Sequence, residues 1–309
     1  MKKDLISIND LTADEIKSIF ALAGKLKKNP SRYSRSLSGR TLALLFQKPS
    51  NRTRVSFEVG MFQLGGHGIY LGPDEIKLGV REAIRDVART LSRYVDGIVL
   101  RTFAHNNVLE MAEYSSVPII NGLSDFSHPC QALADIYTVI EKGREVDKTT
   151  FVYVGDGNNV CNSLIYVCAK LGIDMRIAAP HGYEPDRKLV SEASELAASR
   201  GSSIELFRDP FKAAAGADVI YTDVWASMGQ EKETAKRKKA FKGFQVNDRL
   251  LASAKRDALV MHCLPAHRGE EITDEVLDGR HSVVFDEAEN RMHVQKAVLM
   301  KFLGGRGRS

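Results

Sequence analysis

The sequence lacks the features of a membrane-spanning or secreted protein. No run approaches the roughly 20 apolar residues that a helix needs to cross a bilayer. The first residues lead into a mixed polar stretch without the apolar segment of a signal peptide. The four cysteines, Cys130, Cys161, Cys168 and Cys263, form no C-x-x-C pair, which favours reduced thiols over a disulfide framework. These absences predict a cytoplasmic protein with no membrane partner.

The sequence also lacks a strong excess of one charge. Lys and Arg number 44 against 39 Asp and Glu, which gives a net charge of +5. No basic block is interleaved with aromatic residues, so we expect no nucleic-acid partner. The mild positive excess fits a small anionic substrate. With 309 residues, 43% of them hydrophobic, the chain is long enough for two globular domains.

Strands and helices alternate along the chain in two successive series. The predicted strands are 41–46, 68–71, 96–101, 117–121, 150–155, 174–179, 203–206, 219–222, 259–263 and 283–285. This order predicts an α/β protein with two domains, each a mostly parallel sheet flanked by helices. We expect the first domain at 1–143 and the second at 144–291. The C-terminal segment 292–309 is expected to pack back on the first domain.

Polar residues follow many of the predicted strands, where parallel sheets bind their ligands. These positions are 50–54, Arg101, His128, 156–159, Asp223 and Cys263. Two domains of this kind place their ligand crevices face to face. The pattern therefore predicts a two-substrate enzyme with its active site in the interdomain cleft.

The turn at 50–54, Ser-Asn-Arg-Thr-Arg, is the clearest binding motif. It lies where a strand ends and a helix begins, so backbone N–H groups and the positive end of the helix dipole point toward it. Its arginines add bidentate donors for phosphate oxygens. We predict that the turn binds a phosphorylated small molecule and that Arg101 clamps the same anion. The alternative is a capped helix with solvated arginines.

Two further turns carry polar groups at helix starts. His128 and Gln131 place an imidazole and an amide one turn apart, where they could polarise a carbonyl oxygen; a loop histidine held by its backbone is the alternative. The segment 155–160, Gly-Asp-Gly-Asn-Asn-Val, resembles half of a dinucleotide fingerprint, but Val160 replaces the third glycine. We therefore favour Asn159 as a ligand for an amino-acid head group over nucleotide binding.

Two motifs near the C-terminus complete the set. Asp223 opens a loop that holds the single tryptophan, Trp225, and the loop is either a mobile lid or a plain surface loop. The stretch 262–268 contains one cysteine and two histidines but no fourth zinc ligand at standard spacing. A thiol facing the cleft is favoured over a zinc site. We expect neither a metal nor an organic cofactor.

Taken together and in this order, these motifs resemble the aspartate/ornithine carbamoyltransferase family over nearly the whole chain. The motifs are the turn at 50–54, Arg101, His-Pro-Cys-Gln at 128–131 and His-Cys-Leu-Pro at 262–265. Ser-Met-Gly at 227–229 is similar to the ornithine branch. The resemblance implies transfer of a carbamoyl group from carbamoyl phosphate to L-ornithine, giving L-citrulline and phosphate. It also implies a role in arginine biosynthesis, the urea cycle or arginine breakdown.

The resemblance implies roles for individual residues. The implied catalytic residues are Arg101, His128, Asp223 and Cys263. The implied carbamoyl-phosphate ligands are Ser50, Asn51, Arg52, Thr53, Lys77, Arg101, His128, Gln131, Cys263, Leu264 and Arg291. The implied ornithine ligands are Leu123, through its carbonyl, and Asn159, Asp223, Ser227 and Met228.

The resemblance further implies a homotrimer with active sites shared between subunits, in which Lys77 reaches into a neighbouring site. Two positions depart from the family pattern. Asn51 stands where Thr is usual, and Lys77 stands where Gln or His is more frequent in ornithine enzymes.

Three other functions stay open at this point. One is a related carbamoyltransferase that acts on putrescine or on an N-acylated ornithine. Another is a nucleotide-dependent oxidoreductase that uses the turn at 155–159. The third is a non-catalytic binding protein on the same scaffold, although polar groups at six strand ends argue against it.

Overall fold

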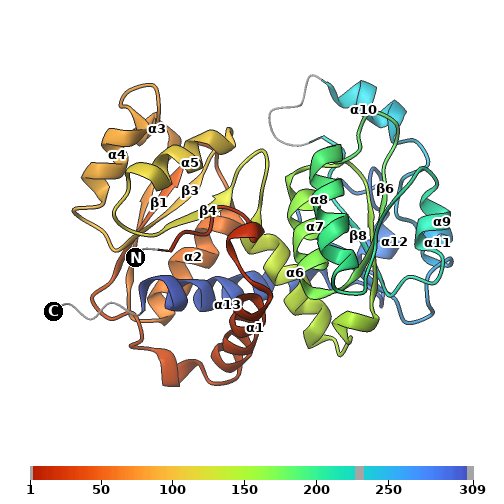
Figure 1. The fold of residues 1–309 in the computed structure, drawn as a ribbon, viewed down its shortest axis with the longest axis horizontal. Helices are drawn as coiled ribbons and strands as arrows, with labels where there is room; N and C mark the ends of the chain where they lie inside the picture. The colour runs from red at the N-terminus through yellow and green to blue at the C-terminus, as the bar shows by residue number, and fades with distance from the viewer. Residues whose placement is uncertain (1–2, 227–232, 305–309) are drawn as a thin grey trace. The chain divides into compact units, whose positions relative to one another are not determined.

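A computed structural model of the chain describes residues 3–226 and 233–304 (Figure 1). Contacts divide it into two compact units, one formed by Met1–Leu133 with Glu289–Ser309 and the other by Ala134–Ala288. The divisions fall inside two helices, α6 (Pro129–Glu141) and α13 (Val284–Leu303). Each unit contains one parallel sheet, so the predicted α/β class with two parallel-sheet domains is confirmed. Within the described residues, no helix has the length and apolarity needed to cross a bilayer.

The first unit is built on a four-stranded parallel sheet with the order β2-β1-β3-β4. The strands are β1 (Thr41–Phe46), β2 (His67–Leu71), β3 (Gly97–Arg101) and β4 (Ile119–Leu123). The remaining helices of this unit are α1 (Ala13–Lys28), α2 (Asn51–Gln63), α3 (Pro73–Ile76), α4 (Ile84–Leu91) and α5 (His105–Tyr114), with short 3₁₀ turns at Ile8–Asp10 and Pro30–Tyr33.

Both faces of this sheet are covered, so its central strands β1 and β3 are apolar except for Thr41 at the start of β1 and Arg101 at the end of β3. Ala43 and Leu45 of β1 point to the face that packs against α4 and α5. On the other face, Gly97 of β3 lies against Leu303 of α13. Helices α2 and α13 approach each other closely at Gly60, where a Cβ would come 3.3 Å from the Lys296 side chain. This packing holds α13 against α2 (Figure 1).

The second unit is built on a five-stranded parallel sheet with the order β7-β6-β5-β8-β9. The strands are β5 (Thr150–Val154), β6 (Asp174–Ala178), β7 (Ile204–Phe207), β8 (Val219–Thr222) and β9 (Leu259–His262). The remaining helices of this unit are α7 (Asn159–Leu171), α8 (Arg187–Ala198), α9 (Pro210–Ala214), α10 (Thr234–Ala240), α11 (Asp248–Leu251) and α12 (Asp274–Leu277), with a 3₁₀ turn at Val146–Lys148. Helices α7 and α8 cover one face, and α9, α11 and α12 cover the other (Figure 1).

One predicted strand is wrong. Residues 283–285 do not form a strand, because α13 begins at Val284 and the pairing is limited to an isolated bridge between Val260 and Ser282. Asp286 and Glu287 lie in the first turn of the helix, where the helix dipole favours acidic side chains. This effect, together with the packing of α13, outweighs the strand preference of Val283 and Val284. The chain after the loop that Asp223 was expected to open contains a further helix, α10.

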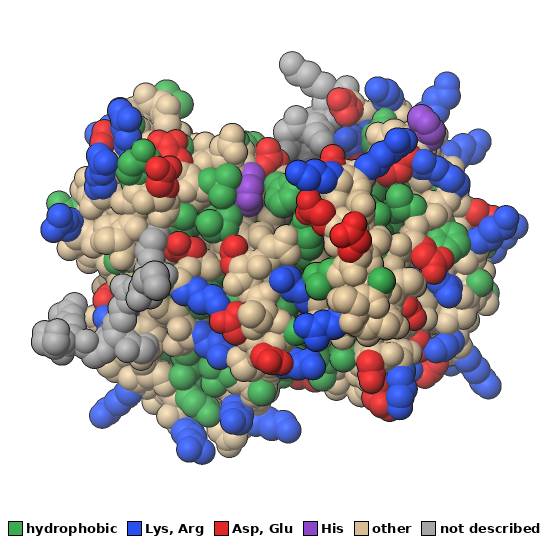
Figure 2. All heavy atoms as spheres, in the orientation of Figure 1, with side chains coloured by type: hydrophobic (Ala, Val, Ile, Leu, Met, Phe, Trp, Pro, Cys, Tyr) green, Lys and Arg blue, Asp and Glu red, His purple; other side chains and the backbone are tan. Residues whose placement is uncertain are grey.

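The surface reflects the near-balanced charge of the sequence. On the face shown in Figure 2, Lys and Arg side chains are interspersed with Asp and Glu. This face therefore carries no broad region of one sign.

The second glycine of the turn after β5 is required by packing. A Cβ at Gly157 would come 2.2 Å from the backbone nitrogen of Pro185 and 2.4 Å from the carbonyl carbon of Glu184. The Gly157 amide also donates to the Tyr183 carbonyl at 2.8 Å. The space that a side chain at position 157 would need is filled by the rigid backbone of residues 184 and 185. Packing of the chain therefore explains the second glycine of the Gly-x-Gly spacing.

We therefore expect Gly157→Ala to lower the free energy of unfolding by about 2 kcal/mol, as overpacking against backbone usually does. Urea unfolding of the purified protein measures this change. Gly68→Ala is the matched control, because a Cβ there would meet its nearest atom at an ordinary 3.7 Å. Equal unfolding midpoints for the two variants would contradict the packing argument.

Candidate active site

The turn at 50–54 forms the start of α2. Ser50 is the N-cap in extended conformation, and its hydroxyl accepts a hydrogen bond from the Thr53 amide at 3.2 Å. The helix begins at Asn51. Asn51, Arg52 and Thr53 therefore lie in the first helical turn, where backbone N–H groups have no acceptor inside the helix. This geometry is that of an anion site.

Helix α13 brings a distant arginine to this turn. Arg291 is 4% exposed, and its Nη2 donates to the buried Thr53 hydroxyl at 2.8 Å. The two residues are 238 positions apart in the sequence. This hydrogen bond places Arg291 beside the turn at 50–54, and its role as a carbamoyl-phosphate ligand stays a prediction.

His128 lies where positive side chains converge. The residue is 4% exposed and directly precedes α6. Burial lowers the pKa of His128 well below its ordinary value, and four nearby cations lower it further. In order of effect these cations are Arg291, Arg101, Lys48 and Arg52. The imidazole is therefore neutral, and the first unit gathers a cluster of cations around it.

The neighbours of this cluster follow from the register of the sheet. Arg101 ends β3 and is 5% exposed, and it pairs in register with Leu123 at the end of β4. The Leu123 carbonyl accepts a hydrogen bond from the Thr102 amide at 2.9 Å; a carbonyl has a second lone pair for another donor. Gln131 is fully buried in the first turn of α6. Lys77 lies on the exposed loop after α3, with a left-handed backbone (φ 39°).

Lys48 belongs to the same cluster but was not predicted from the sequence. It is 8% exposed, and its Nζ lies 4.7 Å from the centroid of the Phe103 ring. Burial, reinforced by the charge of Arg101, lowers the pKa of Lys48 to about 8. Its position two residues before Ser50 was the available signal, but a single lysine in a loop has no distinctive pattern.

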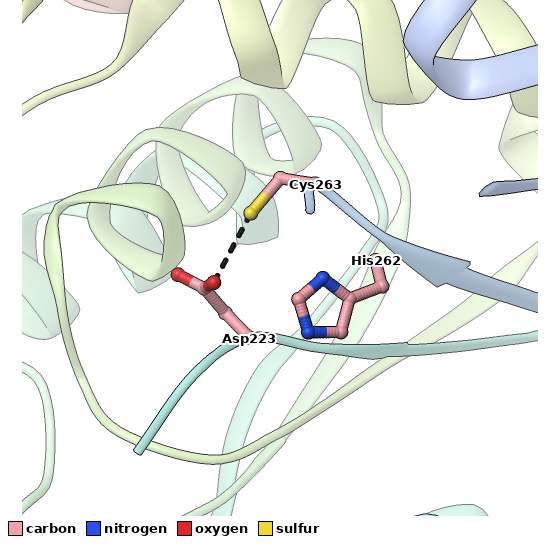
Figure 3. A group of neighbouring side chains, drawn as sticks. All are labelled: Asp223, His262 and Cys263. Atoms are coloured by element: carbon pink, nitrogen blue, oxygen red, sulfur yellow. Dashed lines mark hydrogen bonds between the residues drawn. The ribbon is translucent and has the colours of Figure 1, made fainter. Parts of the chain in front are cut away.

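In the second unit, Asp223 is held by three donors. Its Oδ1 accepts hydrogen bonds from the Cys263 thiol at 3.1 Å (Figure 3) and from the Val224 amide at 2.8 Å. Its Oδ2 accepts from Asn158 Nδ2 at 2.7 Å. Asp223 follows β8 and Cys263 follows β9, so the adjacent strand ends bring the two side chains together. The carboxylate is thereby fixed in orientation.

Asn158 was missed by the sequence analysis, which selected its neighbour Asn159. Asn158 is the N-cap of α7, and its Oδ1 accepts from the amides of Val160 and Cys161. Asn159 is the first residue of the helix. The capping residue thus fixes Asp223 as well as the helix. An Asn immediately before a helical pattern is a recognisable cap, but its link to Asp223 is visible only in three dimensions.

The chemistry of Cys263 is that of a thiol. Burial and the adjacent Asp223 carboxylate raise the pKa of Cys263 well above its ordinary value. The residue that follows, Leu264, has a left-handed backbone (φ 58°), and its amide donates to His262 Nδ1 at 2.8 Å. Cys263 therefore acts as a hydrogen-bond donor to Asp223 and is unsuited to nucleophilic attack.

Asp223, His262 and Cys263 place one potential metal-ligand atom each within 4.8 Å of one another (Figure 3). Each group already makes a hydrogen bond. His262 uses Nδ1 to accept from Leu264 and Nε2 to bond Glu271 at 3.1 Å. The protonated Cys263 thiol bonds Asp223. The absence of a metal from the mechanism stays a prediction.

Asp156 lies next to this group in the turn after β5. Burial raises the pKa of Asp156 to about 6, although Arg237 Nη1, 2.9 Å away, opposes the shift. Two ornithine ligands predicted from the sequence, Ser227 and Met228, lie outside the described residues.

Two family models match the chain. The description "Aspartate/ornithine carbamoyltransferase, carbamoyl-P binding domain" matches residues 3–141. The description "Aspartate/ornithine carbamoyltransferase, Asp/Orn binding domain" matches residues 147–302. The chain belongs to the aspartate/ornithine carbamoyltransferase family. The resemblance found in the sequence is thereby confirmed, and the matched ranges cover the motifs that carried it.

Individual members of the family are similar over their whole length. The chain is 56% identical to an ornithine carbamoyltransferase of Pyrococcus horikoshii over 305 residues, which cover 98% of this chain and 96% of the relative. It is 55% identical to an anabolic ornithine carbamoyltransferase of Pyrococcus furiosus, with 98% and 97% covered. A solved structure of the Pyrococcus furiosus enzyme matches with a TM-score of 0.96 and 54% identity, covering 99% of this chain and 98% of that one.

The pKa of Asp156 makes a testable difference to stability. It is about 6 in the folded chain, against roughly 3.9 for an unperturbed Asp. A group whose pKa is raised by folding stabilises the protein at low pH, and this contribution is lost as the pH rises through the folded pKa. The unmodified chain should therefore lose up to about 3 kcal/mol of its free energy of unfolding between about pH 4 and pH 7. Asp156→Asn cannot titrate at this position and should not show this loss, so its free energy of unfolding should rise by that amount relative to the unmodified chain. Urea unfolding at both pH values measures the gain, and parallel pH dependence of the two proteins would contradict it.

Proposed function

We propose that the chain transfers the carbamoyl group of carbamoyl phosphate to the side-chain amine of L-ornithine, giving L-citrulline and phosphate. The observation that carries the proposal is the set of cations around His128, beside a helix start capped by Ser50. A cluster of this charge requires an anion with several negative oxygens. Full-length similarity to relatives named ornithine carbamoyltransferase supports the choice of reaction.

The first unit binds carbamoyl phosphate in this proposal. The proposed ligands are Ser50, Asn51, Arg52, Thr53, Arg101, His128, Gln131 and Arg291, with Lys77 from a neighbouring subunit and Cys263 and Leu264 from the second unit. Arg52 and the α2 amides hold the phosphate, while Thr53, Arg101 and His128 donate to the carbonyl oxygen. A neutral imidazole suits this role, because it donates a hydrogen bond without adding another charge.

The second unit binds ornithine in this proposal. The proposed ligands are Asn159, Asp223, Ser227 and Met228, with the Leu123 carbonyl from the first unit. Asp223 is suited to hold an ammonium group, because Asn158 and Cys263 already orient its carboxylate. The reaction requires the two substrates to meet, and the expected site in a cleft between the domains stays a prediction.

The chemical step is attack of an uncharged amine on the carbamoyl carbon. A free alkylammonium has a pKa of about 10, so the site must favour loss of its proton. Arg52 and Arg101 repel an ammonium, and exclusion of water acts in the same direction. Negative charge then develops on the carbonyl oxygen, where preorganised donors stabilise it. The C–O bond to phosphate breaks, and the departing phosphate takes up the amine proton.

The identity of the amine is the part of the proposal most open to a direct assay. Putrescine and N-acetylornithine have the same attacking group but lack or block the amino-acid end that Asp223 would hold. A colorimetric assay with carbamoyl phosphate and each of the three amines in parallel should detect a ureido product only in the reaction with ornithine. The name of the Pyrococcus furiosus relative, anabolic, supports a role in arginine biosynthesis.

Assembly and location are also proposed. Val55 and Phe62 of α2 and Ile69 of the edge strand β2 are 53%, 81% and 40% exposed. Exposed apolar residues of this size favour burial against another copy, which supports an oligomer. That the oligomer is a homotrimer is implied by the family resemblance. The four cysteines are all free, and this supports the reducing cytoplasm as the compartment.

Arg52→Ala should reduce kcat/KM for carbamoyl phosphate about a hundredfold or more, because it removes a charged donor to the phosphate and the developing anion. Steady-state citrulline formation measures the loss. Arg54→Ala is the matched control, since Arg54 is exposed, pairs with Glu58 at 3.1 Å and covers the Tyr70 ring. Equal losses in the two variants would refute the assignment of Arg52.

Shared sites can be tested by mixing subunits that each lack one proposed ligand of carbamoyl phosphate. Arg52→Ala and Lys77→Ala chains, denatured together and refolded, should regain activity, because mixed trimers contain sites with both residues intact. Random exchange in a trimer predicts about a quarter of the unmodified activity. Refolding each variant separately is the control. Absence of recovery in the mixture would exclude a contribution of Lys77 to a neighbouring site.

A further inference from the structure

We infer that Gln47 is a positioning residue, which fixes the loop that carries Lys77 relative to the turn at 50–54. The inference rests on the proposed role of Lys77. Gln47 lies between β1 and α2, three residues before Ser50. No motif of the sequence analysis included its side chain.

The side-chain amide of Gln47 joins three segments of the first unit. Its Nε2 donates to the Leu78 carbonyl at 2.9 Å. Its Oε1 accepts from the Thr102 hydroxyl, next to Arg101, and from Asn107 Nδ2 at 3.2 Å. Asn107 Nδ2 also donates to the Thr102 hydroxyl at 2.8 Å. One side chain therefore connects the turn after β1, the end of β3 and the residue after Lys77.

The donors fix which way the amide points. Thr102 and Asn107 both donate to Oε1, so the opposite edge of the amide, Nε2, must face the Leu78 carbonyl. The backbone is fixed as well, because the Gln47 amide donates to the Arg101 carbonyl at 2.8 Å. Thr102 is fully buried, which holds this network in place. A side chain with a donor at one end and an acceptor at the other is required here.

The loop that Gln47 holds is anchored next to Lys77. Leu78 is 3% exposed and packs in the core with Ile84. The Lys77 carbonyl accepts from the amides of Val80 and Arg81, both at 2.9 Å. The backbone around Lys77 is thus compact. The hydrogen bond from Gln47 to Leu78 connects it to the segment that leads into the turn at 50–54. Loss of that bond should displace Lys77 while the other proposed carbamoyl-phosphate ligands stay in place.

A double-mutant cycle in the full-length enzyme tests the inference. Gln47→Met keeps the length and neutrality of the side chain but removes its hydrogen bonds. We expect it to raise the KM for carbamoyl phosphate about fivefold, the size of one neutral hydrogen bond, with kcat and the KM for ornithine unchanged. In a Lys77→Ala background, Gln47→Met should have no further effect. Gln47→Asn, which is too short to reach Leu78, carries the same test if the methionine variant fails to fold.

Gln245→Met is the matched control, because Gln245 also tethers a loop by donating to backbone carbonyls, those of Gly269 and Glu270, but in the second unit. It should leave the KM for carbamoyl phosphate unchanged in both backgrounds. An equal rise with and without Lys77, a parallel rise in the KM for ornithine, or no rise would overturn the inference. Absence of citrulline formation by the unmodified chain would instead refute the proposed function.

Discussion

The proposed site depends on the concentration of positive charge around one neutral imidazole. Arg52 starts α2, Arg101 ends β3 and Arg291 comes from α13, yet all three lower the pKa of His128. Bringing these side chains together out of water is unfavourable unless an anion compensates their charge. The hydrogen bond from Arg291 to Thr53 fixes part of the arrangement. The first unit is therefore organised to receive a phosphoryl group, and its fold supplies the cations from three separate elements.

The second unit provides a complementary, negatively charged group. Asp223 is fixed between Asn158 and Cys263 at the ends of strands that neighbour each other in the sheet. Because the Cys263 thiol stays protonated, it serves to orient the carboxylate. A carboxylate held in this way can position an ammonium group and leave a second, uncharged amine to react. The division of charge between the units matches the chemistry of an anionic donor and a diamino acid acceptor.

Much of the fold could be predicted because its signals are local. The strands at 41–46 and 219–222 have the predicted bounds, since short apolar runs mark them directly. The start of α13 was mistaken for a strand, because tertiary packing decided between two local preferences. At the site, the turn at 50–54 was predictable from its own residues. Lys48 and Asn158 were not, because their roles depend on contacts made by the folded chain.

The most direct test of this account is a crystal structure with N-(phosphonoacetyl)-L-ornithine, which joins analogues of the two substrates in one molecule. The account predicts the phosphonate within hydrogen-bond distance of Arg52, Arg101 and the first amides of α2. It also predicts the amino-acid end beside Asp223. A phosphonate bound away from the start of α2, or facing open solvent there, would contradict the central claim.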